Sequence, residues 1–190
     1  MARRAWAWGV PLAVLALIAL GGLYATTTPR YALYRLGVAM QRHDVAMAEG
    51  YFDAERIADT ATDVIVADYF ARQPEPVTAA EVNGRQLAAT IAHRRLRPQV
   101  LTRVRAEIRR SVERAGIQPV SVALPLGLLG VVRGFEVSRQ GSEAWVSYRD
   151  PVQGPTRFRM SRQADWSWRI SEFDPNWVRR RTQEAPPRIR

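Results

Sequence analysis

The chain has 190 residues, with 28 basic and 18 acidic side chains and a formal net charge of +10. Every basic residue is an arginine, cysteine is absent, and there are only two histidines. This composition excludes disulfide scaffolds, cysteine-ligated zinc or iron–sulfur sites and cysteine nucleophiles, and it argues against a multi-histidine metal centre. The length suits one domain with extensions, and it is enough to bury a hydrophobic core.

An apolar segment without charged residues follows an arginine pair near the N-terminus and extends from residue 5 to residue 25. A helix of about 20 such residues spans the hydrocarbon core of a bilayer, and arginines before it favour a cytoplasmic N-terminus. We therefore expect residues 1–25 to be a single-pass membrane anchor. The rest of the chain would then lie across the membrane, in a periplasmic or extracellular space. A signal peptide cleaved after Gly21 is the alternative.

Three polar residues predict the starts of three helices after this segment. Thr28, Asp44 and Asp53 are residue types that accept hydrogen bonds from the free amides at a helix N-terminus. Pro29 follows Thr28 at the first helical position, where proline is favoured. The third of these helices is expected to run to about Arg72, because two prolines follow closely.

The capping-box pattern of Thr78 and Glu81 predicts a further helical region. We expect Pro98 to interrupt this region, because proline lacks the amide hydrogen that a helix interior needs. A separate amphipathic helix would then run from residue 99 to residue 115. Residues 120–132 are almost wholly apolar, which favours a buried core segment, with an interfacial patch as the alternative.

Four runs of alternating apolar and polar residues predict strands, which cover residues 135–139, 144–148, 156–162 and 166–173. Their short connections favour an antiparallel meander, and helices followed by a meander indicate an α+β fold. Helices packed on a bent sheet of this kind would form a cone like that of nuclear transport factor 2-like (cystatin-like) domains. We expect this domain to span residues 26–177, with the Arg- and Pro-rich residues 178–190 as a disordered tail.

Short motifs follow one another in a recognisable order along the chain. They are a Tyr-x-x-Tyr-x-Leu helix, a basic-Asp turn, an aromatic-acidic step into a helix, and a final Trp-basic-hydrophobic strand. The residues that form them are Tyr31, Tyr34, Leu36, Arg42, Asp44, Tyr51, Phe52, Asp53, Arg56, Trp168, Arg169 and Ile170. In this order, after an apolar N-terminal segment, the chain resembles the bacterial domain of unknown function family 2939. The resemblance implies a membrane-anchored envelope protein, and it implies no activity.

Large apolar side chains occupy alternating positions of the expected strands. They would line either the core beneath the sheet or a shallow apolar cavity that takes a lipid or another small ligand. The residues are Phe135, Val137, Trp145, Tyr148, Phe158, Met160, Trp166 and Trp168.

Glu55, Asp59 and Asp63 follow one another at intervals of four residues, and they therefore share one face of the third helix. Like charges at this spacing repel one another, so the face is expected either to be solvated or to dock against an arginine-bearing helix. The alternative is a cation site or a pair of carboxylates for acid/base chemistry.

Eight arginines lie within residues 94–114. Such a run is compatible with nucleic acid, but the expected periplasmic location argues against that partner. Anionic lipid headgroups fit better, because basic groups near such a surface bind it electrostatically. The residues considered for this contact are Arg94, Arg95, Arg97, Arg103, Arg110 and Arg114.

The charge is also unevenly distributed, with five arginines against nine acidic residues in residues 26–82 and 21 against nine in residues 83–190. An acidic layer of helices could therefore face an arginine-rich layer within the fold. No catalytic, cofactor or metal residues are expected. We expect a non-enzymatic protein that binds or scaffolds an unidentified protein partner at the periplasmic face of the inner membrane. A lipid- or ligand-binding module and a carboxylate-based enzyme are the alternatives.

Overall fold

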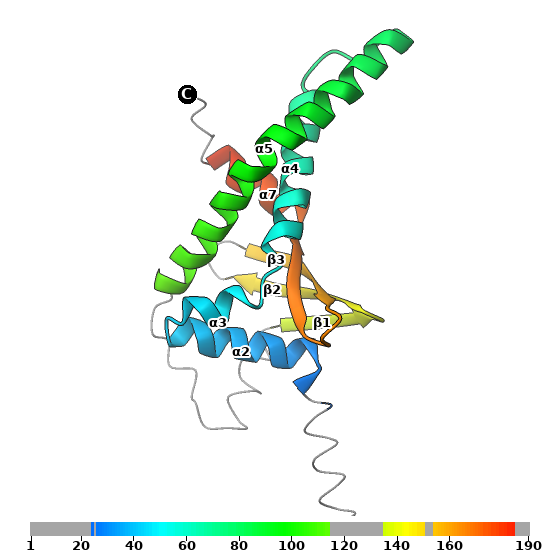
Figure 1. The fold of residues 1–190 in the computed structure, drawn as a ribbon. Coiled ribbons are helices and arrows are strands. Elements are labelled where there is room, and N and C mark those ends of the chain that lie inside the picture. The colour runs from blue at the N-terminus through cyan, green and yellow to red at the C-terminus, as the bar shows by residue number, and fades with distance from the viewer. Residues whose placement is uncertain (1–23, 25, 115–134, 151–153, 185–190) are drawn as a thin grey trace, which may run out of the picture.

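The computed structural model describes residue 24 and residues 26–114, 135–150 and 154–184, and Figure 1 shows their arrangement. Helices come first and a sheet follows, so the fold is α+β as expected. In chain order the elements are α2 (Pro29–Gln41), α3 (Val45–Glu49), α4 (Ala54–Ala71), α5 (Ala79–Arg114), β1 (Phe135–Gln140), β2 (Glu143–Asp150), β3 (Gly154–Arg162), β4 (Trp168–Phe173) and α7 (Pro175–Glu184).

The expected membrane anchor and the apolar segment 120–132 lie outside the described residues, except for Tyr24 at the end of the anchor. Within the described part of the chain, no helix combines the length and apolar character needed to cross a bilayer.

The first three helices begin where their capping residues predict. The side chains of Thr28, Asp44 and Asp53 each accept a hydrogen bond from the backbone amide three residues later, at 3.2, 2.9 and 3.1 Å. These bonds satisfy amides that have no partner inside the helix. The predicted starts of α2, α3 and α4 are therefore confirmed, and α4 ends one residue before Arg72, as expected.

The expectation that Pro98 separates two helices is wrong. A single helix, α5, continues through this position for 36 residues. Proline removes one hydrogen bond of the helix and leaves the others, so packing on both sides can hold the helix together. Here Arg97 and Arg105, on either side of Pro98, both form ion pairs with α4.

The four strands form one antiparallel sheet in the order β1-β2-β3-β4, which is the expected meander. The register changes between β3 and β4, where Met160 pairs with Ile170 but Arg159 pairs with Glu172. One residue of β4, Ser171, is therefore extra, and it is fully buried. The free edge of β4 is covered by the chain before α4, since the amide of Ile170 donates to the carbonyl of Tyr51 at 2.8 Å.

The core lies between one face of the sheet and the helices α2, α4 and α5. The helices contribute one turn after another of apolar side chains, and the strands contribute alternate residues. Trp168 is the largest fully buried side chain among the described residues, and its indole Nε1 donates to the carbonyl of Thr27 at 2.7 Å. The other large core residues include Leu33, Leu36, Ile57, Val112, Val146, Phe158, Met160 and Ile170.

The expectation of a disordered tail from residue 178 is wrong for residues 178–184, which belong to α7. Val178 is buried, and Arg179 Nε donates to Asp68 Oδ1 of α4 at 3.0 Å. The contact with α4 gives this arginine-rich segment a partner that its composition does not reveal. Residues 185–190 lie outside the described part of the chain.

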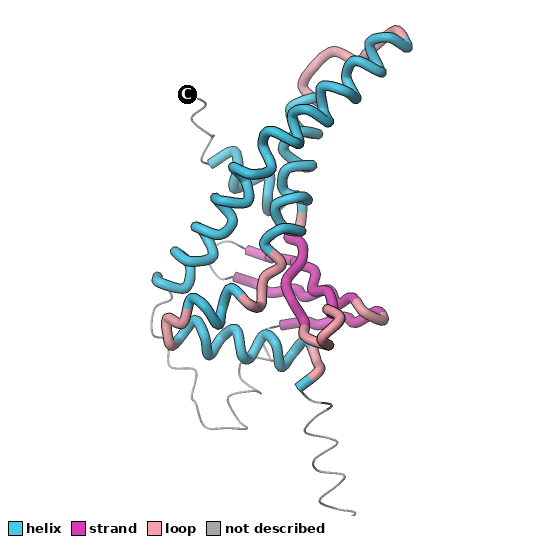
Figure 2. Tube along the Cα trace, in the orientation of Figure 1, coloured by secondary structure: helices cyan, strands magenta, loops and turns pink. Residues whose placement is uncertain are grey.

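The helices α4 and α5 form a long antiparallel hairpin, which we call the arm (Figure 2). One end of the hairpin packs near the sheet, and the other end extends well beyond it. The described chain begins near the start of α2, at the end of the molecule opposite the tip of the arm. The connection between the two helices, residues 72–78, is almost entirely exposed.

Candidate functional site

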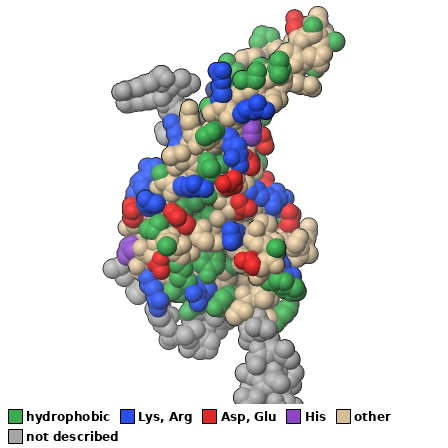
Figure 3. Space-filling view, viewed as in Figure 1, with side chains coloured by type: hydrophobic (Ala, Val, Ile, Leu, Met, Phe, Trp, Pro, Cys, Tyr) green, Lys and Arg blue, Asp and Glu red, His purple; other side chains and the backbone are tan. Residues whose placement is uncertain are grey.

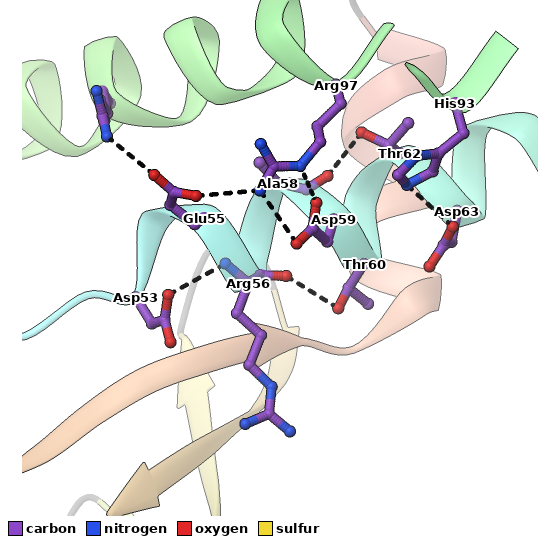
Figure 4. A network of polar contacts seen from close by, with 11 residues as sticks. Asp53, Glu55, Arg56, Ala58, Asp59, Thr60, Thr62, Asp63, His93 and Arg97 are labelled. Carbon is purple, nitrogen blue, oxygen red and sulfur yellow. Dashed lines mark hydrogen bonds and ion pairs between the residues drawn. The ribbon is translucent and has the colours of Figure 1, made fainter. Parts of the chain in front are cut away.

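The acidic face of α4 is in contact with α5, as Figure 4 shows. Arg97 of α5 lies between Glu55 and Asp59. Its Nη2 atom is 3.1 Å from Glu55 Oε2 and 3.3 Å from Asp59 Oδ2, and its Nε atom donates to Asp59 Oδ1. The guanidinium therefore binds Asp59 with two nitrogens, in the geometry that an arginine fork favours.

Further pairs extend this contact in both directions along the helices. Towards the sheet, Arg105 Nη2 lies 3.7 Å from Glu55 Oε1. Towards the tip of the arm, His93 Nε2 lies 3.3 Å from Asp63 Oδ1. Acidic residues later in α4 pair with basic residues earlier in α5, as antiparallel helices require. We call this row of pairs the seam.

The seam is closed at the tip of the arm by Arg85 of α5. Its guanidinium donates to the backbone carbonyl of Phe70 and lies 3.4 Å from the carbonyl oxygen of Gln73. The carbonyls in the last turn of α4 have no partner within the helix, and a cation is electrostatically favourable at that end. The same guanidinium carbon lies 5.7 Å from the centre of the Phe70 ring. Arg85 thus ties the start of α5 to the end of α4.

The two carboxylates hold Arg97 firmly in its charged form. The hydrogen bond to Asp59 raises the pKa of the Arg97 guanidinium most, and the hydrogen bond to Glu55 adds to this effect. About a third of the side chain remains exposed. The ion pairs are therefore partly screened by solvent, and their strength should depend on salt concentration.

Of the interpretations that the sequence leaves open for Glu55, Asp59 and Asp63, docking against an arginine-bearing helix agrees with the structure. All three carboxylates have a basic partner on α5. The expected pairing of an acidic layer with an arginine-rich layer is thus present. Among the described residues there is no group of three or more acidic or histidine side chains arranged to hold a metal ion.

The arginines considered for anionic surfaces divide into two groups. Arg97 belongs to the seam, and Arg110 Nη2 pairs with Glu107 Oε2 of its own helix at 3.2 Å. The other four are exposed on α5 and form no ion pair within the described part of the chain. They are Arg94, Arg95, Arg103 and Arg114.

The eight large apolar residues that were expected to line a core or a cavity do not all lie on one face of the sheet. Phe158, Met160 and Trp168 are buried in the core. Trp145 is on the opposite face of the sheet, where the guanidinium carbons of Arg157 and Arg159 lie 4.5 and 5.7 Å from its ring centre. Strand alternation requires this, because Trp145 is adjacent in sequence to two residues that point into the core.

Three more of the set lie on the core face at the outer end of the sheet, where they are partly buried. Phe135 stacks on Tyr148 across β1 and β2 with 4.9 Å between ring centres, and Val137 is paired with Val146.

The prediction that Trp166 belongs to a strand and lines the core or a cavity is wrong. Trp166 is 60% exposed and precedes β4. Its φ of 68° places it in a left-handed turn. The turn is fixed by Asp165, whose carboxylate accepts hydrogen bonds from the backbone amide and hydroxyl of Ser167 at 3.0 and 2.6 Å. The Trp166 ring forms a cation–π contact with Arg162, whose guanidinium carbon lies 3.7 Å from the ring centre. The apparent alternation before residue 168 is therefore a turn.

Sequence reasoning missed how many large apolar residues are exposed on the arm. Five of the seven large exposed hydrophobic residues in the described chain belong to the arm, and Figure 3 shows hydrophobic side chains on its surface. They are Tyr69, Val77, Val82, Leu87 and Ile91. The signal was the spacing of Leu87 and Ile91, which places both on one side of a helix otherwise rich in polar residues.

These features define a molecule with a packed body, a charged seam and an extended arm that exposes several apolar residues. In comparisons with protein-family models, with curated proteins and with solved structures, the chain has no match.

Proposed function

We propose that this chain is a single-pass bacterial envelope protein that binds or scaffolds other molecules at the periplasmic face of the inner membrane, without catalysis. The apolar residues 5–25 would supply the anchor, and the arginine pair before them would keep the N-terminus in the cytoplasm. The described residues would then lie on the periplasmic side.

The arm is the observation that carries the binding role. A helical hairpin that extends beyond the body adds little to the core, but it offers a long accessible surface. Among its exposed apolar residues, Leu87 and Ile91 lie four residues apart on one side of α5, and exposed apolar surface often marks sites of interaction. The seam supports the same role, since Arg97 and Arg85 hold the two helices side by side.

The proposal includes a fold type and a family. Helices packed on one face of an antiparallel meander are compatible with a cone of the nuclear transport factor 2-like type. Four of the residues that carry the resemblance to family 2939 lie at helix caps or in the core, namely Asp44, Asp53, Trp168 and Ile170. Such positions suit structural motifs, and they assign no activity.

Fractionation of cells that express the full chain tests the anchor and the location together. We expect the protein to stay in the membrane fraction after alkaline washing and to leave it only in detergent. Protease added to spheroplasts should digest it, whereas protease added to intact cells should not. Release by alkaline washing would contradict the anchor, and resistance to protease in spheroplasts would contradict the periplasmic orientation.

A second candidate function is contact with anionic lipid headgroups through α5. The exposed side chains of Arg94, Arg95, Arg103 and Arg114 favour it, because none is paired within the described residues. Each basic group near such a surface contributes roughly 1 kcal/mol of binding free energy. We expect full-length protein reconstituted in nanodiscs to bind phosphatidylglycerol vesicles, and to lose that binding in 0.5 M salt or when the four arginines are changed to Gln. Equal binding to neutral vesicles would contradict this candidate.

A further inference from the structure

Four small or apolar residues form a regularly spaced row on the exposed side of α5. Ala80, Gly84, Leu87 and Ile91 follow one another at intervals of four, three and four residues, which is the spacing of a coiled-coil contact. All four are exposed. We call this set the outer stripe. Leu87 lies two residues after Arg85, so it points about 200° away from the side that faces α4.

Contacts among the described residues do not explain Gly84. A glycine inside a helix costs about 1 kcal/mol relative to alanine. A β-carbon added to Gly84 would meet nothing within 4 Å, so no neighbour in the described part of the chain requires the absence of a side chain. A helix packed closely on the outer stripe would require it.

The charges beside the outer stripe identify which partner fits. Glu81 lies near its beginning, and Arg95 lies near its end on the same flank. When two copies of a helix pack antiparallel, residues on the same flank meet, and early positions face late ones. Glu81 of each copy would therefore lie near Arg95 of the other. A parallel pair would instead bring Arg94 and Arg95 of both copies together, where like charges repel.

We propose that the outer stripe binds the outer stripe of a second copy of this chain, with the two α5 helices antiparallel. Leu87 would pack against Ile91 of the other copy, and Gly84 would make room for the long side chain of Arg94. A two-fold axis normal to a membrane would leave both N-terminal ends at the same bilayer. The arrangement is therefore compatible with two copies anchored in one membrane, their arms lying along it.

Light scattering or sedimentation of the full chain in mild detergent gives the first test. We expect a dimer that dissociates on dilution, and about a tenfold or greater rise in its dissociation constant for Leu87→Glu, because a charge would be buried without a partner. Val77→Glu is the matched control, since Val77 is 91% exposed and lies off the stripe; it should change the constant less than about twofold. A monomeric wild type, or equal effects of both substitutions, would overturn the proposal.

Disulfide cross-linking tests the relative orientation of the two α5 helices. Introduced cysteines can pair only with one another, because the chain has no cysteine of its own. In the antiparallel pair, residue 84 of one copy faces residue 94 of the other, whereas the two residues 84 are separated by about 15 Å along the helices. Mixed Gly84→Cys and Arg94→Cys chains should therefore form disulfide-linked dimers on oxidation, and neither variant alone should. Cross-linking of Gly84→Cys with itself would contradict the antiparallel arrangement.

Charge reversal gives an independent readout. Glu81→Arg and Arg95→Glu should each weaken the dimer, and the double variant should recover it. Glu81→Arg also removes the hydrogen bonds of Glu81 at the start of α5, and Arg95→Glu cannot restore them. Recovery of the dimer in the double variant would therefore report the contact between the two copies. Failure of the double variant to recover would overturn the pairing of Glu81 with Arg95.

Discussion

The Nδ1 atom of His43 lies 3.0 Å from the carbonyl oxygen of Val112, which is 69 residues further along the chain. A carbonyl oxygen can only accept a hydrogen bond, so Nδ1 carries the hydrogen and donates it. Val112 is in the last turn of α5, where carbonyls lack helical partners. His43 thus fastens the end of α5 to the turn between α2 and α3.

His43 also adopts a backbone conformation that usually belongs to glycine, with φ of 52°. It closes α2, since its amide donates to Met40 and the amide of Asp44 donates to Ala39. We predict that His43→Ala lowers the free energy of unfolding by about 1–2 kcal/mol, because the hydrogen bond is lost while the strained backbone stays. His43→Gly should lose less, because glycine relieves the strain. Urea unfolding of the two variants checks this order, and an alanine variant as stable as the glycine variant would contradict it.

Arg97 should stabilise the arm through its geometry as well as its charge. We predict that Arg97→Gln and Arg97→Lys both lower the thermal unfolding midpoint, because lysine cannot bind Asp59 with two nitrogens while reaching Glu55. The loss should shrink in 0.5 M salt, where exposed ion pairs are screened. Arg103→Gln is the matched control, because Arg103 is exposed on the same helix and lies outside both the seam and the outer stripe; it should leave the midpoint unchanged. A lysine variant equal to wild type would show that charge alone suffices.

The two tryptophans near the start of β4 should respond very differently to substitution. Trp168 is 1% exposed and Trp166 is 60% exposed. We predict that Trp168→Ala lowers the free energy of unfolding by about 3–5 kcal/mol through lost burial and a cavity. Trp166→Ala should change it by less than about 0.5 kcal/mol. Denaturant unfolding measures both, and a large loss for Trp166→Ala would refute its placement in an exposed turn.

Glu81 should make the start of α5 sensitive to acid. Its carboxylate accepts hydrogen bonds from the backbone amides of Val77 and Thr78 at 2.8 and 3.1 Å, and the bond from Val77 lowers its pKa most. Because its pKa is lowered, the Glu81 carboxylate contributes its full stabilisation of the start of α5 above pH 4.5, the ordinary value. This stabilisation is lost as the pH falls through the lowered pKa.

We predict that Glu81→Gln speeds hydrogen exchange of the Val77 and Thr78 amides at neutral pH, because the neutral amide accepts these bonds more weakly. The difference between Glu81→Gln and wild type should narrow as the pH falls below 4.5 and the wild-type carboxyl becomes neutral. A difference that stays constant down to pH 2 would contradict the role of the carboxylate charge.

Much of the fold can be read from short local signals. The helix caps at Thr28, Asp44 and Asp53 depend on bonds that span three residues, so the sequence around each is sufficient to predict it. The capping box of Thr78 and Glu81 is confirmed for the same reason, with Glu81 N donating to Thr78 Oγ1 at 3.3 Å. The strands are similarly local, because alternation and short turns leave the meander as the simplest pairing.

The features that the sequence did not predict depend on partners far away in the chain. Pro98 fails to end α5 because α4 holds the helix on both sides of it. The helix α7 has partners far away in the chain, since Val178 is buried and Arg179 binds Asp68, 111 residues earlier. Trp145 and Trp166 were misplaced for a different reason, since hydrophobic type alone does not reveal on which side of a sheet or turn a side chain points.

The acidic face of α4 serves to hold α5, and a double-mutant cycle between Asp59 and Arg97 measures this contact. Asp59→Asn, Arg97→Gln and the double variant would be compared with wild type by urea unfolding. We predict that the double variant loses clearly less stability than the two single losses combined, because each single change already breaks the same contact. Strict additivity would contradict the claim, since it would mean that the two side chains do not interact.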